Sequence, residues 1–238
     1  MVSRLIVHTK NSFHSLKWMQ LNFNNLRKQL ESQGYYSISI CKFFLWKKSA
    51  KYFKVFDASG NCFFVKLQSE DKVRHEYKIF KYLEKHNLSS IDFYPKIYLS
   101  NIGNFSYNVF EELDGVRINE KIILDFNLIG QMKKIVSFLS SIEVVHRDIR
   151  PHNIIVVNET MKIIDFEHSS IGNEIMDNNS NKLNKDFSPN GKIWDDAYSF
   201  KKIVEYYVNK NLLEKNIDYA KLKKMAGKNT YGIDKKNI

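Results

Sequence analysis

Residues 146–153 read His146-Arg147-Asp148-Ile149-Arg150-Pro151-His152-Asn153, and residues 163–167 read Ile163-Ile164-Asp165-Phe166-Glu167. Between them, the apolar runs 154–157 and 161–164 predict two short strands joined at residues 158–160. A hairpin of that length brings Asn153, at the start of one strand, close to Asp165, after the other. With Asp148, three oxygen-bearing side chains would converge. This arrangement suits a hard cation such as Mg²⁺ and the positioning that phosphoryl transfer requires.

These stretches resemble the catalytic loop and the metal-binding motif of the protein-kinase-like superfamily, H-R-D-x-x-x-x-N followed by D-F-G. The first motif matches at all four defining positions, whereas Glu167 stands where protein kinases have Gly. The resemblance implies that Asp148 orients the acceptor hydroxyl and accepts its proton, while Asn153 and Asp165 hold Mg²⁺. It also implies an α+β, bilobal fold, in which an antiparallel N-lobe sheet with one main helix precedes a reduced, mostly helical C-lobe.

An apolar run with a single Lys, Phe63–Leu67, resembles the strand of the family's V-A-I-K motif. A Lys buried in such a run needs a partner. Glu76 lies beside the apolar face of the helix predicted next, on which residues 73, 77, 80 and 83 recur at helical spacing. The resemblance implies that Lys66 is a catalytic residue that holds the α- and β-phosphates of ATP, and that Glu76 fixes Lys66 in an ion pair. Glu70 is an alternative partner, and the bland alternative is that Lys66 and Glu76 both face solvent.

Two further assignments concern nucleotide binding. Residues 107–115 resemble the last N-lobe strand and the hinge, where backbone groups of Glu111 to Leu113 would bind adenine; an ordinary strand ending in a turn has the same pattern. Arg150 stands where protein Ser/Thr kinases have Lys. The resemblance and the phosphate-matching guanidinium imply a catalytic contact with the γ-phosphate. The alternative is that Arg150 only forms an ion pair within its loop.

The remaining helices are predicted from periodicity. Residues 128–139 give an amphipathic helix, and residues 212–225 give another near the end of the chain. Residues 195–200, Asp-Asp-Ala-Tyr-Ser-Phe, resemble the D-x-W-S-F segment that opens the family's central C-lobe helix. Asp196 would support the catalytic loop by accepting hydrogen bonds from its backbone, and His146 would support it as well. An acidic helix start is also favoured by the helix dipole alone.

Three departures from protein kinases affect the expected acceptor. Residues 42–54 contain no glycine, where protein kinases have a glycine-rich hairpin; Lys47, Lys48 and Lys51 are expected at the tip, holding phosphates by charge. No A-P-E motif follows Asp165, and residues 171–192 are expected to form a loop. About 30 residues follow the central helix, too few for a peptide-docking subdomain. These features resemble small bacterial kinases of sugars, lipopolysaccharide or aminoglycosides, whereas the His-Arg pair before Asp148 is more typical of protein kinases.

Composition favours one bilobal domain: 238 residues, 43% hydrophobic and 14% aromatic, can bury a substantial core. We expect a helical extension at 1–35, an N-lobe at 36–114 and a C-lobe at 115–238. Cys41 and Cys62 are expected in strands as packed thiols, not in a disulfide or metal site. No apolar run is long enough for a membrane span or a secretory signal. We therefore expect a cytoplasmic protein. Peripheral contact with the inner face of the membrane is compatible with this location.

A net charge of +11 indicates an anionic partner, such as a glycan, a glycolipid or a membrane surface; no signature of specific nucleic-acid binding is present. Residues 13–30 predict an amphipathic helix that caps the N-lobe core or lies at a membrane interface. The sequence therefore predicts ATP-dependent transfer of phosphate to a hydroxyl of a sugar or surface glycan. The alternatives are a Ser/Thr protein kinase and a nucleotide-binding pseudokinase scaffold.

Overall fold

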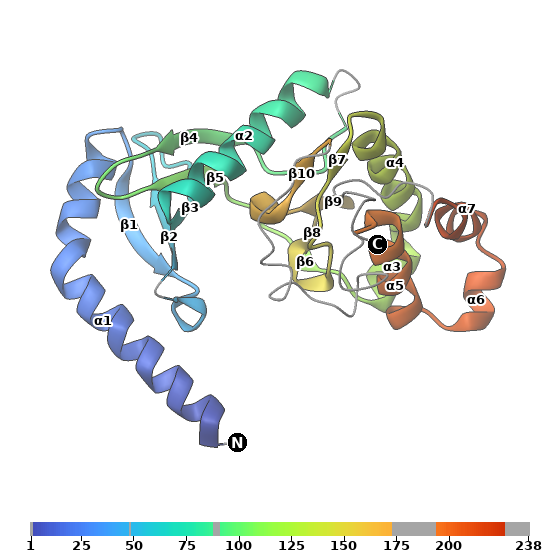
Figure 1. Ribbon diagram of the computed structural model, residues 1–238, viewed down its shortest axis with the longest axis horizontal. Helices are drawn as coiled ribbons and strands as arrows, with labels where there is room; N and C mark the ends of the chain where they lie inside the picture. Colours follow the sequence, from blue (N-terminus) through green and yellow to red (C-terminus); the bar gives the residue numbers. More distant parts are fainter. Residues whose placement is uncertain (1, 48, 88–90, 173–193, 227–238) are drawn as a thin grey trace, which may run out of the picture. The chain divides into compact units, whose positions relative to one another are not determined.

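The computed structural model describes residues 2–47, 49–87, 91–172 and 194–226 (Figure 1). The chain divides into two compact units, one made of Met1–Tyr77 and Lys96–Glu112 and the other of Lys78–Pro95 and Leu113–Ile238. We refer to them as unit 1 and unit 2. The predicted α+β class with an antiparallel sheet is confirmed, and that sheet has five strands. No described helix combines the length and the apolar character needed to cross a membrane.

Unit 1 is built on that antiparallel sheet. Its strands lie in the order β1 (Tyr36–Cys41), β2 (Ala50–Phe56), β3 (Cys62–Gln68), β5 (Tyr107–Glu111) and β4 (Ile97–Asn101). A short 3₁₀ helix, η1 (Phe43–Leu45), lies between β1 and β2. Both cysteines lie in strands as predicted, and they are free and half-buried. Successive side chains of a strand point to opposite faces, so the sheet can serve two different functions on its two faces.

One face of the sheet holds the apolar core of unit 1. Helix α1 (Val2–Glu31) packs there through Leu26 and Leu30, which are fully buried against aromatic and aliphatic residues of β2, β3 and β5. The other face of β3 carries Lys66, which lies opposite Asn108 of β5 in the strand register. Helix α2 (Glu70–His86) begins two residues after β3 and contacts this polar face through Glu76. The alternation along β3 therefore separates a structural face from a polar one.

Helix α1 differs from its prediction in length and in the use of its faces. It begins at Val2 instead of near Phe13, and Leu16, an apolar residue within the predicted helix, is 57% exposed. Met19 and Phe23 do pack against the core, as expected. The cause is that only the second half of the helix lies over the sheet. Among the side chains described in α1, those that cap the unit 1 core therefore lie in that half.

Unit 2 combines short strands with helices around a buried central helix, α4 (Leu128–Ser141). Its other elements are β6 (Val116–Arg117), α3 (Glu120–Asp125), β7 (Val144–Val145), η2 (Pro151–Asn153), β8 (Ile154–Val157), β9 (Thr160–Ile163), η3 (Phe166–His168), β10 (Ser170–Ile171), α5 (Asp196–Tyr207), α6 (Lys210–Glu214) and α7 (Ile217–Met225). Helix α4 contacts β7 and β9 as well as α5 and α7. The apolar stripe predicted for this helix is fully used in that core.

The predicted hairpin is present as β8 and β9, in register from Ile154–Ile163 to Val157–Thr160. Its two turn residues, Asn158 and Glu159, both have positive φ, which matches the twist of the strands they join. The helix predicted at 212–225 is wrong as one element. It is two helices, α6 and α7, because the side chain of Asn216 accepts the Tyr219 N–H and starts a new helix. Most of the expected loop at 171–192 lies outside the described residues.

Candidate functional site

Lys66 and Glu76 form a buried ion pair in unit 1. The Lys66 Nζ lies 3.0 Å from the Glu76 Oε1, and the two side chains are 8% and 1% exposed. Glu70, the alternative partner in the sequence, instead pairs with Arg74 on the exposed side of α2 at 2.6 Å. The pairing follows from position: Lys66 lies on the polar face of β3, and Glu76 lies on the buried side of α2. Removing two charges from water costs free energy that such a pair rarely returns in full, so stability alone does not account for it.

Asn108 belongs to the same cluster and was not predicted. Its Nδ2 lies 3.3 Å from the Val73 carbonyl and 3.5 Å from the Glu76 Oε2, so the second carboxylate oxygen also faces a donor. Asn108 is fully buried, and its Oδ1 has no hydrogen-bond partner among the described residues. The available signal was an amide in the middle of the apolar strand β5, where burial of a polar group requires partners.

In unit 2, Asp148 and Asn153 are joined by hydrogen bonds within one tight loop. The Asn153 Nδ2 donates to the Asp148 Oδ2 at 2.8 Å and to the Asp148 carbonyl oxygen at 2.9 Å. Pro151 opens the 3₁₀ turn that brings Asn153 back toward Asp148. The Asn153 carbonyl accepts the Ile164 N–H at 3.0 Å. Asp165 directly follows Ile164, so this hydrogen bond holds the backbone before Asp165 against the loop. The hairpin thus brings the two motifs together as the sequence predicted.

The two oxygens of the Asp148 carboxylate differ in their partners. Its Oδ2 accepts from Asn153 and lies 3.1 Å from a terminal guanidinium nitrogen of Arg150. Its Oδ1 is buried and has no hydrogen-bond partner among the described residues. Burial raises the pKa of Asp148 to about 6; the Arg150 cation lowers it and the nearby Asp165 raises it. A carboxyl with this pKa is a better proton acceptor near neutral pH than an ordinary Asp.

Asn153 and Asp165 provide oxygen atoms suited to a hard cation. Because both amide protons of Asn153 face Asp148, its Oδ1 is turned away, and no described residue donates to it. Asp165 has left-handed backbone angles, φ 71° and ψ 62°, which are uncommon outside glycine and often occur at functional sites. Among the described residues, no group of three His, Cys, Asp or Glu forms a metal site by itself. One amide oxygen and one carboxylate fit Mg²⁺ only when phosphates and water complete its shell.

Asp196 and His146 hold the loop in place. The Asp196 carboxylate accepts the backbone N–H groups of His146 at 2.7 Å and Arg147 at 3.2 Å. Arg147 is strained at φ 68°, and these bonds secure that turn. The His146 Nδ1 accepts the Asp148 N–H at 3.2 Å, and Nε2 lies 3.2 Å from the Ile164 carbonyl oxygen, an arrangement that suits the tautomer with a proton on Nε2. Burial raises the pKa of Asp196 to about 7, against the effect of its two N–H donors.

Two segments were predicted to bind the nucleotide: residues 111–113 and the connection between β1 and β2. The Glu111 N–H donates to the Lys96 carbonyl at 2.9 Å and is therefore occupied, whereas the Leu113 backbone has no hydrogen bond to a described residue. In the connection between β1 and β2, Lys51 does not lie at the tip. It lies in β2, 4% exposed, with its Nζ 4.7 Å from the Trp18 ring centre. Lys47 is exposed, and Lys48 lies outside the described residues.

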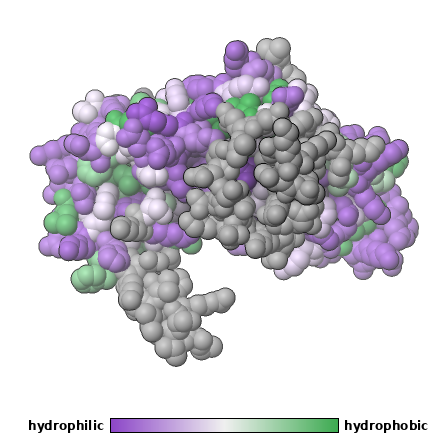
Figure 2. Space-filling view, in the orientation of Figure 1, coloured by the Kyte–Doolittle hydropathy of each residue, from purple (hydrophilic) through white to green (hydrophobic). Residues whose placement is uncertain are grey.

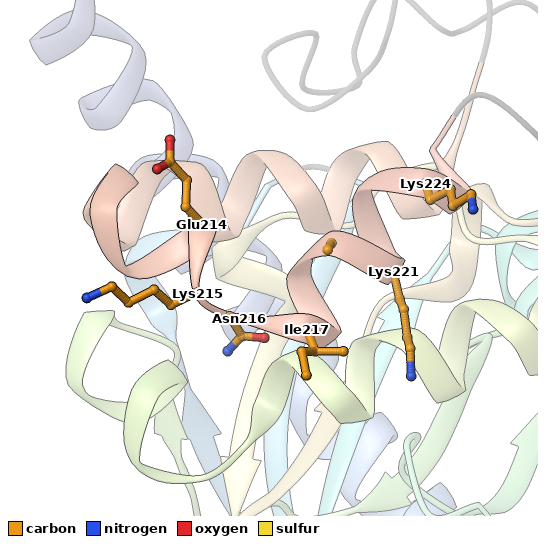
Figure 3. A pocket seen from close by; sticks show the side chains of 7 residues that line it. Glu214, Lys215, Asn216, Ile217, Lys221 and Lys224 are labelled. Carbon is orange, nitrogen blue, oxygen red and sulfur yellow. The ribbon is translucent and has the colours of Figure 1, made fainter.

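A separate cavity of about 270 Å³ lies at the corner between α6 and α7 (Figure 3). It is lined by Glu214, Lys215, Asn216, Ile217, Ala220, Lys221 and Lys224. Helix α7 packs on α4 and α5, and α4 in turn contacts β9. None of the predicted site residues lines this cavity. It is therefore distinct from the Asp148 loop.

Neither a protein-family model nor a curated protein sequence matches this chain. The assignment of the site therefore rests on the residues and their geometry.

Proposed function

We propose that this protein is an ATP-dependent phosphotransferase of the bilobal, protein-kinase-like fold, which transfers the γ-phosphate to a hydroxyl. The observation that carries the proposal is the Asp148–Asn153 loop: the buried Asp148 Oδ1 has no partner among the described residues, and no described residue donates to the Asn153 Oδ1. Buried polar atoms without partners are costly, so native structures keep few of them. A substrate hydroxyl and a cation are the partners that these atoms fit.

Asp148 acts on the acceptor. Its carboxylate accepts the proton of the acceptor hydroxyl while the hydroxyl oxygen forms a bond to the γ-phosphorus, and the bond from that phosphorus to the leaving oxygen of ADP breaks. The raised pKa of Asp148, about 6, makes proton transfer more favourable than a free Asp would. The main contribution remains positioning, because phosphoryl transfer depends mostly on orientation and charge neutralisation.

Three other groups act on ATP and its cation. Asp165 and Asn153 would hold Mg²⁺, which would neutralise phosphate charge when bound. Lys66 would bind the α- and β-phosphates, with Glu76 and Asn108 fixing its position. Arg150 pairs with Asp148, while its Nε is buried without a partner. In the proposal the Arg150 guanidinium has both roles considered from the sequence. Its ion pair orients Asp148, and its Nε–H donates to the γ-phosphate.

The acceptor is proposed to be a sugar or lipopolysaccharide-type glycan hydroxyl. A net charge of +11 suits an anionic acceptor, and the sequence between Asp165 and Asp196 lacks the A-P-E motif of protein kinases. ATP would be consumed with Mg²⁺ as the cofactor.

The test is ATP consumption by the intact protein with glycans, small sugars and generic protein substrates. The proposal predicts Mg²⁺-dependent turnover that rises with a glycan or sugar and disappears in Asp148→Asn. Turnover stimulated only by protein substrates would show that the acceptor is a Ser or Thr side chain of a protein and not a glycan. Nucleotide binding without any turnover would make the chain a nucleotide-binding scaffold.

A further inference from the structure

Helix α1 is much longer than the sheet that it covers. Its 30 residues span about 45 Å at the usual rise per residue, whereas the 7 residues of β2 or β3 span about 23 Å. Among the side chains that the structure describes, apolar contacts with the core run from Trp18 to Leu30. Figure 1 shows the N-terminal half continuing beyond the sheet of unit 1. That half needs another reason to be helical, because isolated helices of this length are marginal in water.

The part of α1 near residue 17 exposes large apolar side chains. Phe13, Leu16 and Leu21 are 68%, 57% and 63% exposed. On the face shown in Figure 2, the coloured surface is mostly hydrophilic, and small hydrophobic areas interrupt it, including at the coloured part of the edge along which α1 runs. Single exposed apolar residues are normal, but three within nine residues of one helix form a patch. We call Phe13, Leu16, Lys17 and Leu21 the α1 patch.

The charge of α1 is entirely of one sign over almost its whole length. Residues 2–30 contain five basic residues and no Asp or Glu: Arg4, Lys10, Lys17, Arg27 and Lys28. A second copy of the chain would bring two such helices together and oppose cation to cation. Self-association through this face is therefore disfavoured, and an anionic partner is favoured.

The position of Lys17 distinguishes a lipid surface from a protein groove. At 100° per residue, Lys17 lies about 40° around the helix from Phe13 on one side and from Leu21 on the other. A protein groove that takes both apolar side chains would bury the ammonium between them. At a bilayer surface, the Lys stem lies along the acyl region while the ammonium reaches the phosphates.

We propose that the α1 patch binds the surface of an anionic lipid bilayer, with this part of α1 lying in the interface. This inference goes beyond phosphotransfer and does not depend on it. It would place the protein at a membrane through the exposed apolar side chains and the basic charge of one helix.

The α6–α7 corner is the competing surface and supplies a matched control. It exposes Ile217 by 73%, beside Lys221, but Glu214 and Asp218 accompany its lysines. In Figure 3, Ile217 and Lys221 extend from the same side of α7. If general basicity and exposed apolar surface were enough, this corner would bind lipid equally well.

The experiment is co-sedimentation of the intact protein with vesicles of phosphatidylcholine alone or with phosphatidylglycerol added. We expect binding to the anionic vesicles only, weakening as salt is raised. The variant Phe13→Ser/Leu16→Ser should lower the partition coefficient about tenfold or more. Lys17→Gln should lower it about fivefold, since one Lys near an anionic surface contributes about 1 kcal/mol. The control Ile217→Ser/Lys221→Gln should bind like the unmodified protein.

Circular dichroism should show unchanged helix content for all three variants, because the altered side chains are exposed. Lys17→Gln keeps the apolar area, so the proposal stays testable even if the double variant folds poorly. Equal binding to neutral and anionic vesicles, no binding at all, or loss of binding in the α7 control would each overturn it. An oligomer that dissociates in Phe13→Ser/Leu16→Ser without lipid would assign the patch to a second copy instead.

Discussion

Unit 1 and unit 2 each contain an ion pair with a buried carboxylate. The two pairs differ in solvent exposure and in how completely the carboxylate oxygens are hydrogen-bonded. In unit 1, both Glu76 oxygens face donors, and the Lys66 and Glu76 side chains are 8% and 1% exposed. In unit 2, Asp148 is 3% exposed, Arg150 is 35% exposed, and one oxygen of Asp148 has no partner. The first pair is closed, so breaking it should affect folding stability as well as the phosphate binding proposed for Lys66. The second is open, so changing it should affect mainly the chemistry.

The largest expected effect comes from breaking the closed pair. Glu76→Leu leaves Lys66 buried without a counter-charge and should lower the free energy of unfolding by about 3–5 kcal/mol. Adding Lys66→Met should restore most of the lost free energy of unfolding, because two apolar side chains then replace the ion pair. The double variant should be inactive, because Lys66 is proposed to bind the phosphates of ATP. Urea unfolding of the intact protein measures both.

Glu70→Gln is the matched control, since Glu70 pairs with Arg74 on the exposed side of the same helix. Its effect should stay below about 1 kcal/mol. A Glu76→Leu variant no less stable than this control would show that the closed pair does not support the fold.

The next effect concerns the open pair. Asp148→Asn keeps the size of the side chain but removes the proton acceptor, so turnover should fall about a hundredfold or more with little change in ATP affinity. Asp125→Asn, an exposed Asp at the end of α3, should have no effect. Steady-state kinetics and ATP titration separate the two quantities. Unchanged turnover in Asp148→Asn would remove Asp148 from the chemistry.

A smaller effect appears in stability against pH. Asp148 has a folded-state pKa of about 6, above its ordinary value, so its protonated form is favoured by folding. Its contribution to stability is complete below the ordinary pKa and is lost as pH rises through about 6. Asp148→Asn should therefore gain about 1 kcal/mol on the unmodified protein between pH 5 and pH 8, because most of one pKa unit of the shift falls in that window. Unfolding curves for the two proteins at both pH values measure this, and parallel curves would contradict the raised pKa.

The smallest effect tests the link between Arg150 and Asp148. The value of kcat/KM should fall below about pH 6 as Asp148 becomes protonated. Arg150→Gln should move this fall to higher pH, because the Arg150 cation lowers the pKa of Asp148. Arg117→Gln, at an exposed position in β6, should leave the profile unchanged. A profile that stays in place in Arg150→Gln would mean that the two groups are not coupled.

Much of unit 1's polar face could be predicted because its signal is local. A Lys within the apolar run of β3 requires a carboxylate, and helical spacing places Glu76 on the buried side of α2. The same reasoning applies to Asn108 in β5 but was not used. Asn216, a common first residue of a helix, likewise marked the division between α6 and α7.

Other features depend on contacts between distant residues and could not be predicted. Lys51 is buried because Trp18 of α1 covers it. The pKa of Asp148 depends on how deeply the loop is packed, which no spacing in the sequence specifies. For the same reason the sequence predicted an amphipathic α1 without showing that Leu16 is left exposed beyond the sheet.

The most direct measurement is transfer of labelled γ-phosphate from ATP to a glycan acceptor, by the unmodified protein and Asp148→Asn side by side, with ATP binding measured for both. We expect label in the acceptor with the unmodified protein, and nearly none with Asp148→Asn although it still binds ATP. Transfer at equal rates would contradict the assignment of the open pair to chemistry. ATP binding by both proteins with transfer by neither, to any hydroxyl acceptor, would contradict the proposal that this chain is a phosphotransferase.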